Sequence, residues 1–317
     1  MNPLSNELAE GVRKGDVRAL ARAISIVENG EAQARALLAA LFPHAGGSLV
    51  VGVTGPPGSG KSTLVDRLTA RLRRDGKTVA IVAVDPSSPF SGGAILGDRI
   101  RMQGHAADEG VFIRSMATRG HLGGLAAATG EVLTLLSASG KDVILVETVG
   151  VGQDEVEIVG SADVSVVVLV PGLGDEVQAL KAGIMEIADV FVVNKADRDG
   201  VDRVVAEIES MLSLATHEGQ PPPAIVKTVA TEDRGIDELW AAVEAFRTRS
   251  AGNGVLAQRR RGQLRRQLEQ TLQDRLLVRA RAAVLAPGEL EKTVDRLEAR
   301  TVDPQAAAEE VLKRMGL

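Results

Sequence analysis

Seven short runs rich in valine and isoleucine alternate with longer amphipathic stretches between Leu49 and about Arg247. Most of these runs are apolar throughout, which is typical of strands that are covered by helices on both faces. Repeated strand–helix units of this kind predict an α/β fold, doubly wound around a mostly parallel sheet. The expected strands are residues 50–54, 78–84, 111–114, 143–147, 164–170, 190–194 and 224–228.

Helical segments are expected on both sides of this core. Apolar residues recur at helical spacing up to about Phe42, and after Ser250 the sequence has helical character alone. An apolar stripe in the last part of the chain is formed by Leu264, Leu268, Leu272 and Leu276. A long amphipathic helix with little sequence left to cover it suggests a homodimer. We therefore expect a helical N-terminal extension (1–44), a central domain (45–250) and a C-terminal helical dimerisation arm (251–317).

Composition restricts the function. The net charge of −5 argues against non-specific nucleic-acid binding as the main activity. The chain has no cysteine, which excludes disulfides, thiolate zinc sites and cysteine nucleophiles. Its longest apolar runs are far shorter than a membrane span, and its N-terminus has no apolar signal core, so a cytoplasmic location without membrane contact is expected.

A glycine loop follows the first expected strand and precedes a helix. It matches the pattern G-x-x-x-x-G-K-[ST], which is informative in this context. Glycines allow successive backbone N–H groups to turn toward one point, and the N-terminus of the helix adds partial positive charge. Lys61 would reach the β- and γ-phosphates, and the Ser62 hydroxyl would bind Mg²⁺. The loop predicts a nucleoside triphosphate site made of Gly55, Pro57, Gly58, Ser59, Gly60, Lys61, Ser62 and Thr63.

A second motif, Asn194-Lys195-Ala196-Asp197, ends a buried strand and indicates that the base is guanine. The Asp197 carboxylate can accept hydrogen bonds from N1–H and the exocyclic amine of guanine, whereas adenine has no N1–H. An unmade charged hydrogen bond costs about 1.5–3 kcal/mol. Asn194 can tie this loop to the phosphate loop, and the stem of Lys195 can lie along the base. Backbone contacts to the base are expected after the next strand, from Val229, Ala230 and Thr231.

Several side chains are candidates for a Mg²⁺ site beside the phosphates. We expect Ser62 to be a direct ligand. Glu147, at the tip of a strand, would hold a metal-bound water, and the Gly150 amide would sense the γ-phosphate. Asp85 and Asp98 follow the second expected strand, although Asp85 could instead form a turn before the next proline. Mg²⁺ usually keeps several waters and takes few protein carboxylates.

With these motifs in place, the chain resembles the MeaB/ArgK/MMAA family of P-loop GTPases, within the SIMIBI class. The resemblance extends over nearly the whole chain. The motifs that distinguish the family are the segments 84–88 (VDPSS), 95–102 (ILGDRIRM), 147–153 (ETVGVGQ) and 171–175 (PGLGD).

The resemblance implies a homodimeric GTPase that binds GTP and GDP and chaperones an adenosylcobalamin-dependent acyl-CoA mutase, typically methylmalonyl-CoA mutase. In this family GTP binding and hydrolysis gate delivery of the cobalamin cofactor and protect or reactivate the mutase. Residues 170–181 would form an additional switch loop that senses the partner, with functional positions at Asp175, Gln178 and Lys181. Without the resemblance, this segment reads equally well as the start of a helix with an acidic first turn.

The residue after Gly150 affects the expected rate of hydrolysis. Many GTPases place a water-orienting glutamine there, whereas this chain has Val151. An alkyl group cannot align an attacking water, so we expect slow intrinsic hydrolysis that a partner accelerates. Gln153 is the nearest candidate substitute. The candidate catalytic residues are Lys61, Glu147 and Gln153, to which the family resemblance adds Lys181.

Three other functions compete with this one. A metallochaperone GTPase that loads nickel or zinc usually has Cys/His clusters, but the four histidines here have no tight ligand spacing. An ATP-dependent kinase or transport ATPase would need a preference for adenine, which Asp197 opposes. The only support for a nucleic-acid-binding factor is the arginine run 259–261 (RRR). Because acidic residues resume nearby, a solvated helix face or a dimer rim is the stronger expectation for this run.

Overall fold

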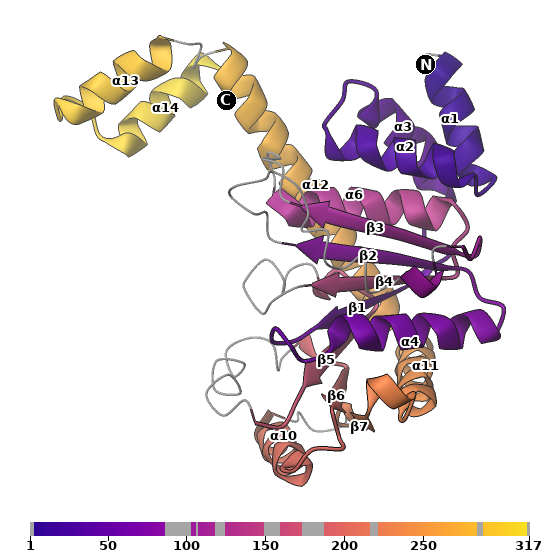
Figure 1. Cartoon of the computed structure of the whole chain (residues 1–317). Coiled ribbons are helices and arrows are strands. Elements are labelled where there is room, and N and C mark those ends of the chain that lie inside the picture. Colours follow the sequence, from indigo (N-terminus) through magenta and orange to yellow (C-terminus); the bar gives the residue numbers. More distant parts are fainter. Residues whose placement is uncertain are drawn as a thin grey trace. The chain divides into compact units, whose positions relative to one another are not determined.

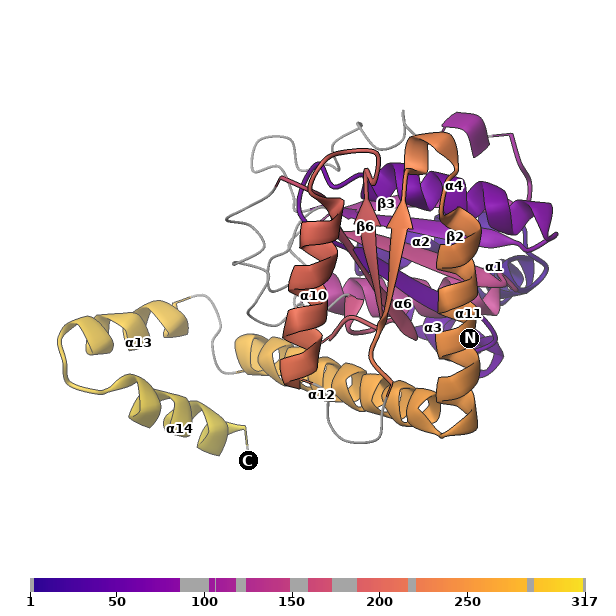
Figure 2. The ribbon, with the colours of Figure 1, turned by 90° about the horizontal axis from the view of Figure 1, so that it is seen from below.

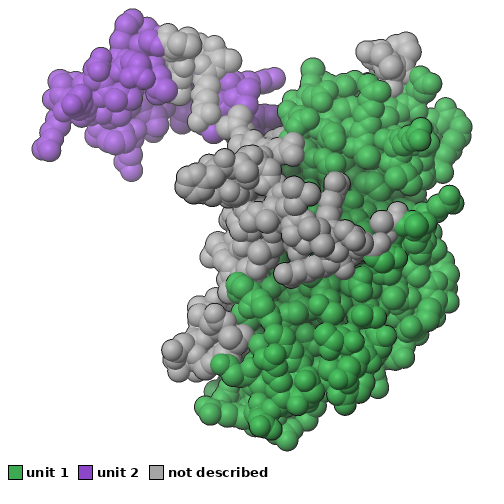
Figure 3. Space-filling view, viewed as in Figure 1, with its two compact units in different colours: residues 1–263 green, residues 264–317 purple. Residues whose placement is uncertain are grey.

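The computed structural model describes residues 3–85, 103–105, 107–117, 124–148, 159–172, 187–215, 221–283 and 288–315. The chain forms two compact units, residues 1–263 and 264–317 (Figure 3). Helix α12 (Val255–Ala283) begins in the first unit, and the second unit also contains α13 (Glu289–Glu298) and α14 (Pro304–Arg314). The first unit includes the N-terminal helices together with the sheet. The boundaries expected at residues 44 and 250 stay predictions.

The first unit is built on a seven-stranded sheet in which every neighbouring pair of strands is parallel (Figure 1). The strand order is β3-β2-β4-β1-β5-β6-β7. All seven expected strands are present, with bounds close to those read from the Val/Ile runs. They are β1 (Leu49–Thr54), β2 (Val79–Asp85), β3 (Val111–Ala117), β4 (Val143–Thr148), β5 (Val164–Leu169), β6 (Val190–Asn194) and β7 (Ala224–Thr228).

Helices cover both faces of this sheet (Figures 1 and 2). One face packs against α1 (Pro3–Arg13), α2 (Val17–Glu28), α3 (Ala34–Leu41) and α6 (Gly124–Ala138) through a core that includes Ile24, Leu135 and Val82. Farther along the sheet, α10 (Val201–Ala215) covers β5 and β6. The other face packs against α4 (Lys61–Arg74) and α11 (Ile236–Gly252), with Leu68 and Trp240 in the core. The doubly wound α/β prediction is confirmed.

Asp163, which is buried just before β5, joins three parts of the chain. Its carboxylate accepts the backbone N–H of Val50 in β1 at 3.0 Å. Arg260 of α12 donates to both carboxylate oxygens, at 2.7 and 2.8 Å, and to the carbonyl oxygens of Gly46 and Ser48, at 3.0 and 3.1 Å. The hydrogen bonds to Asp163 raise the pKa of Arg260. A buried carboxylate is tolerated here because it is paired and hydrogen-bonded.

Asp189 has a matching arrangement just before β6. Its carboxylate accepts the backbone N–H of Ser165 at 2.8 Å and two hydrogen bonds from Arg259, at 2.6 and 2.7 Å. The guanidinium of Arg259 also lies 5.1 Å from the centre of the Phe246 ring. The expected solvated face or dimer rim is therefore wrong for Arg259 and Arg260, because both pair with buried carboxylates at the amino edge of the sheet. Arg261 is exposed.

The second unit exposes the leucine stripe expected from the sequence. Leu264, the first residue of this unit, is 49% exposed, and Leu268 is 69% exposed. Exposed apolar stripes of this kind are common at protein interfaces. The homodimer stays a prediction. None of the helices in the described ranges combines the length and the apolar character that a membrane span requires.

We predict that Arg260→Gln lowers the free energy of unfolding by about 2–3 kcal/mol, because it leaves Asp163 buried without its charged partner. This expected loss of stability is smaller than the usual cost of breaking a fully buried ion pair, since the Arg260 side chain is 39% exposed. Urea denaturation followed by circular dichroism would measure the change. The matched control is Arg261→Gln, one residue along the same helix, which we expect to change stability by less than about 0.5 kcal/mol. Equal stabilities of the two variants would contradict this account of the pair.

Candidate nucleotide-binding site

The expected phosphate loop joins β1 to α4 at the carboxyl edge of the sheet. β1 lies between β4 and β5, where the chain passes from one half of the sheet to the other. In doubly wound sheets, ligands bind beyond the carboxyl ends of the strands at such a switch point. The topology therefore places residues 55–62 where a nucleotide would bind.

Two positions of the loop require glycine, both because neighbouring atoms lie too close for a side chain and because the backbone has a positive φ. Gly55 has φ 147°, and a Cβ at this position would lie 2.2 Å from the carbonyl oxygen of Val168 in β5. Gly60 has φ 91°, and its Cβ would lie 2.4 Å from Nδ2 of Asn194. A larger residue at Gly55 would clash with the backbone of β5, and one at Gly60 would displace the Asn194 amide.

Lys61 and Ser62 begin α4 and are both buried. Nζ of Lys61 donates to the carbonyl oxygens of Gly55 and Pro56, at 2.8 and 3.0 Å, so the ammonium group is held inside the curve of the loop. The Ser62 hydroxyl donates to Oε1 of Glu147 in β4 at 2.6 Å. A hydroxyl and a carboxylate side by side are the hard oxygen ligands that Mg²⁺ prefers. These two residues fit the metal site expected from the sequence.

Asn194, at the end of β6, connects the phosphate loop to the segment after β7. Its Nδ2 donates to the carbonyl oxygen of Ser59 at 2.8 Å. Its Oδ1 accepts from the Thr228 hydroxyl at 3.0 Å and from the backbone N–H of Ala230 at 3.2 Å. Thr228 was not predicted from the sequence; it pairs with Asn194 in the sheet register and immediately precedes the expected base-contacting residues. One buried amide therefore sets the spacing of two loops.

Lys195 and Asp197 follow β6 at the same carboxyl edge of the sheet. Lys195 has φ 57°, an uncommon conformation for a non-glycine residue, and its Nζ donates to the carbonyl oxygen of Gly58 at 2.7 Å. Asp197 is exposed, as is Thr231, whereas Val229 is buried. The guanine-recognition role of Asp197 stays a prediction.

Other expected site residues are only partly covered by the structure. Asp85 ends β2, in the strand next to the one that carries Glu147. Within the described ranges, no group of three or more histidines, aspartates or glutamates is arranged to hold a metal ion. The following expected residues lie outside the described residues: Asp98, Gly150, Gln153, Asp175, Gln178 and Lys181.

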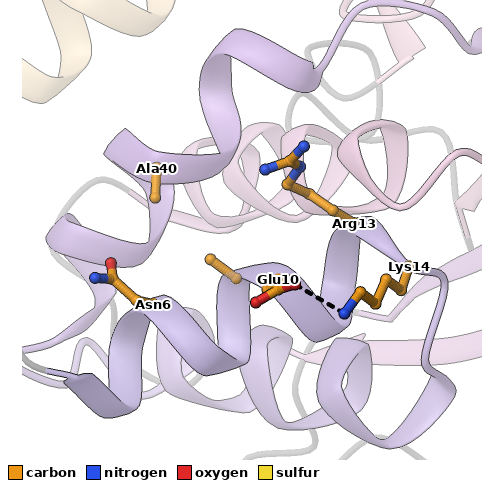
Figure 4. Close-up of a pocket in the computed structure, with 6 residues that line it drawn as sticks. Asn6, Glu10, Arg13, Lys14 and Ala40 are labelled. Carbon is orange, nitrogen blue, oxygen red and sulfur yellow. Dashed lines mark ion pairs between the residues drawn. The ribbon is translucent and has the colours of Figure 1, made fainter.

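A hollow of about 400 Å³ lies on the N-terminal helices (Figure 4). It is lined by Asn6, Glu10, Arg13 and Lys14 of the α1 region and by Ala40 of α3, among others. Two of its lining residues, Glu10 and Lys14, form an ion pair of 2.7 Å, and both side chains are largely exposed. Its lining includes no residue of the phosphate loop or the guanine motif, so it is separate from the candidate site.

Comparison with known proteins identifies the family. The family model described as methylmalonyl Co-A mutase-associated GTPase MeaB matches residues 20–284. The GTPase ArgK of Escherichia coli is 40% identical over 85% of this chain and 86% of its own length. The methylmalonic aciduria type A homolog of Mus musculus is 36% identical over 81% of this chain and 66% of its own length.

A solved structure agrees with these sequence matches. The crystal structure of an LAO/AO transport system kinase superposes with a TM-score of 0.73 and 30% identity, and the match covers 100% of this chain and 99% of that one. The chain belongs to the MeaB family of P-loop GTPases.

Two glycine substitutions test the geometry of the loop. Gly58 and Gly60 both have positive φ, but a Cβ on Gly58 would meet nothing within 4 Å. We predict that Gly58→Ala costs about 1–2 kcal/mol from backbone strain alone. Gly60→Ala adds the clash with Asn194 and should destabilise the protein further. Urea denaturation of both variants without nucleotide would measure the difference, and equal losses would show that Asn194 does not limit the loop.

Proposed function

We propose that this MeaB-family GTPase is a GTP-hydrolysing chaperone of an adenosylcobalamin-dependent acyl-CoA mutase, of the methylmalonyl-CoA mutase type. The single observation that best supports nucleotide binding is the position of the Asn194 amide, which joins Ser59 of the phosphate loop to Thr228 and Ala230. This arrangement fits one ligand that reaches both loops, with phosphates at one end and a purine at the other. The mutase part is supported by the description of the family as methylmalonyl Co-A mutase-associated.

At the base end, Asp197 recognises guanine through N1–H and the exocyclic amine. Lys195 is fixed to the phosphate loop through Gly58, so its stem can cover one side of the base. Backbone groups of residues 229–231 complete the contacts. An adenine base would leave the Asp197 carboxylate partly unpaired, and this is the source of the guanine preference.

At the phosphate end, Lys61 neutralises charge on the β- and γ-phosphates, and backbone N–H groups of the loop contact the α- and β-phosphates. Ser62 and Glu147 would hold Mg²⁺, Ser62 directly and Glu147 directly or through water, and the ion would neutralise charge that develops on the phosphates. Asp85 and Asp98 are further candidates for this shell. Val151 cannot orient an attacking water, so hydrolysis by the isolated chain is slow.

GTP binding and hydrolysis would act as the signal to the mutase. Segments around Asp98, residues 147–150 and residues 175–181 contact the γ-phosphate and the metal in one state and are released after hydrolysis. The change in these segments alters the affinity for the mutase and therefore the timing of cobalamin entry. Asp175, Gln178 and Lys181 sense the partner, and the exposed leucine stripe of the second unit supports a homodimer.

Nucleotide binding is tested by titration calorimetry with GDP and ADP in the presence of Mg²⁺. We predict that Lys61→Ala abolishes binding, since it removes the charge on the phosphates. Asp197→Asn should reduce the preference for GDP over ADP by tenfold or more, because the amide cannot accept from both guanine donors. Arg261→Gln, an exposed change far along the chain, serves as a control with wild-type affinity. Tighter binding of ADP than of GDP by the wild-type chain would contradict the guanine assignment.

The chaperone role is tested by single-turnover GTP hydrolysis with and without the methylmalonyl-CoA mutase of the same host. We predict a slow rate for the isolated chain and a rate at least tenfold higher with the mutase, because the partner orders the switch segments. Lys181→Ala should lose most of the stimulation by the mutase. A fast basal rate that no mutase changes would contradict the proposed mechanism.

A further inference from the structure

Two arginines on α4 reach across to the segment that follows β7. The guanidinium of Arg67 lies 3.6 Å from Oδ2 of Asp233, and Arg71 forms an ion pair and a hydrogen bond with Asp237. Arg67 and Arg71 are one helical turn apart, and the two aspartates are also four residues apart. Asp233 belongs to the loop after β7, whereas Asp237 lies in the first turn of α11, which follows that loop directly. The two ion pairs therefore link α4 to consecutive parts of the chain, and we call them the α4 brace.

The loop that Asp233 ties to α4 is compact. Val229 and Arg234 exchange backbone hydrogen bonds of 3.0 and 3.3 Å, which closes residues 229–234 into a tight loop. Asp233 adopts φ 56° within this loop, a conformation that aspartate and asparagine tolerate better than most residues. Below it, Ala230 and Ile236 pack in the same core as α4. The loop is therefore closed by its own backbone hydrogen bonds and packed in the core that it shares with α4.

The brace joins the two ends of the proposed nucleotide site. Helix α4 begins with Lys61 and Ser62, which belong to the phosphate end, whereas the loop contains Ala230, which belongs to the base end. We infer that Arg67 and Arg71 are positioning residues that hold the base-contacting segment 229–231 at a fixed distance from the phosphate loop. They would act through this segment and not through a contact with the nucleotide. This inference rests on the proposed guanine-nucleotide site, in which Asp197 selects guanine, and adds a device that holds the second base-contacting segment in place for that selection.

The effect of the brace is expected to be modest for each pair. The side chains of Arg67 and Asp233 are 39% and 54% exposed, and those of Arg71 and Asp237 are 21% and 72% exposed, so solvent screens both pairs. Arg71 also pairs at 2.5 Å with Asp75, the C-cap residue that follows its own helix. Losing one pair should weaken GDP binding about twofold to fivefold, and losing both about tenfold.

The test uses the full chain and titration calorimetry with GDP and with ADP in the presence of Mg²⁺. We predict that the double variant Arg67→Gln/Arg71→Gln binds GDP about tenfold more weakly while its ADP affinity changes less than threefold. The preference for guanine, and not only the affinity, should therefore fall. Asp233→Asn is a second variant that keeps the backbone conformation and removes one charge. It should weaken GDP binding about as much as Arg67→Gln, and combining these two changes should add little.

Arg73→Gln is the matched control. Arg73 lies on the same helix but donates two hydrogen bonds, of 2.8 and 2.9 Å, to Asp108 on the opposite flank, where they lower the pKa of that carboxyl. Its loss should lower thermal stability and leave the ratio of GDP to ADP affinity within twofold of the wild type. A similar loss of preference in Arg73→Gln, or an unchanged preference in the double variant, would overturn the inference while leaving the proposed site intact. If the wild-type chain fails to bind GDP, the proposed site and the brace fail together.

Discussion

When a parallel sheet is buried on both faces, polar side chains are accommodated mainly at the amino and carboxyl ends of its strands. Strands β4, β5 and β6 are buried at every residue, so hydrogen-bonding and charged groups gather where the strands begin and end. At the carboxyl edge these groups form a candidate ligand site. At the amino edge they pair with one another and hold the start of α12. The same constraint therefore separates the candidate ligand site from the ion pairs that stabilise the fold.

At each edge the connection between elements depends on a buried polar side chain with several partners. The Asn194 amide fixes the distance between two loops, and Asp163 fixes β1, β5 and α12 together. Buried groups of this kind are costly unless every partner is present, so each of them specifies one arrangement of its neighbours. The hydrophobic cores determine that the sheet forms. These polar contacts determine how its ends are connected.

The sequence predicted the strands and the phosphate loop because both are local signals. Apolar runs identify buried strands, and the glycine spacing of residues 55–60 reports backbone conformation directly. The fold class followed from their alternation. Contacts between distant segments could not be predicted in this way. Arg259 and Arg260 look like a solvated run, because nothing in their neighbourhood indicates two aspartates located 70 and 97 residues earlier in the chain. Thr228 was missed for the same reason, since its partner is defined by sheet register.

The shortness of β6 restricts the insertions and deletions that this chain can accept in evolution. The strand is five residues long, and it is bracketed by Asp189 at one end and Asn194 at the other. It spans about 17 Å, and a one-residue slip would point each of its side chains to the opposite face. An insertion or deletion inside β6 would turn the fully buried Phe191 away from its core and pull one bracketing residue off its partners. Length variation among related sequences should therefore occur in the connecting segments and be absent from this strand.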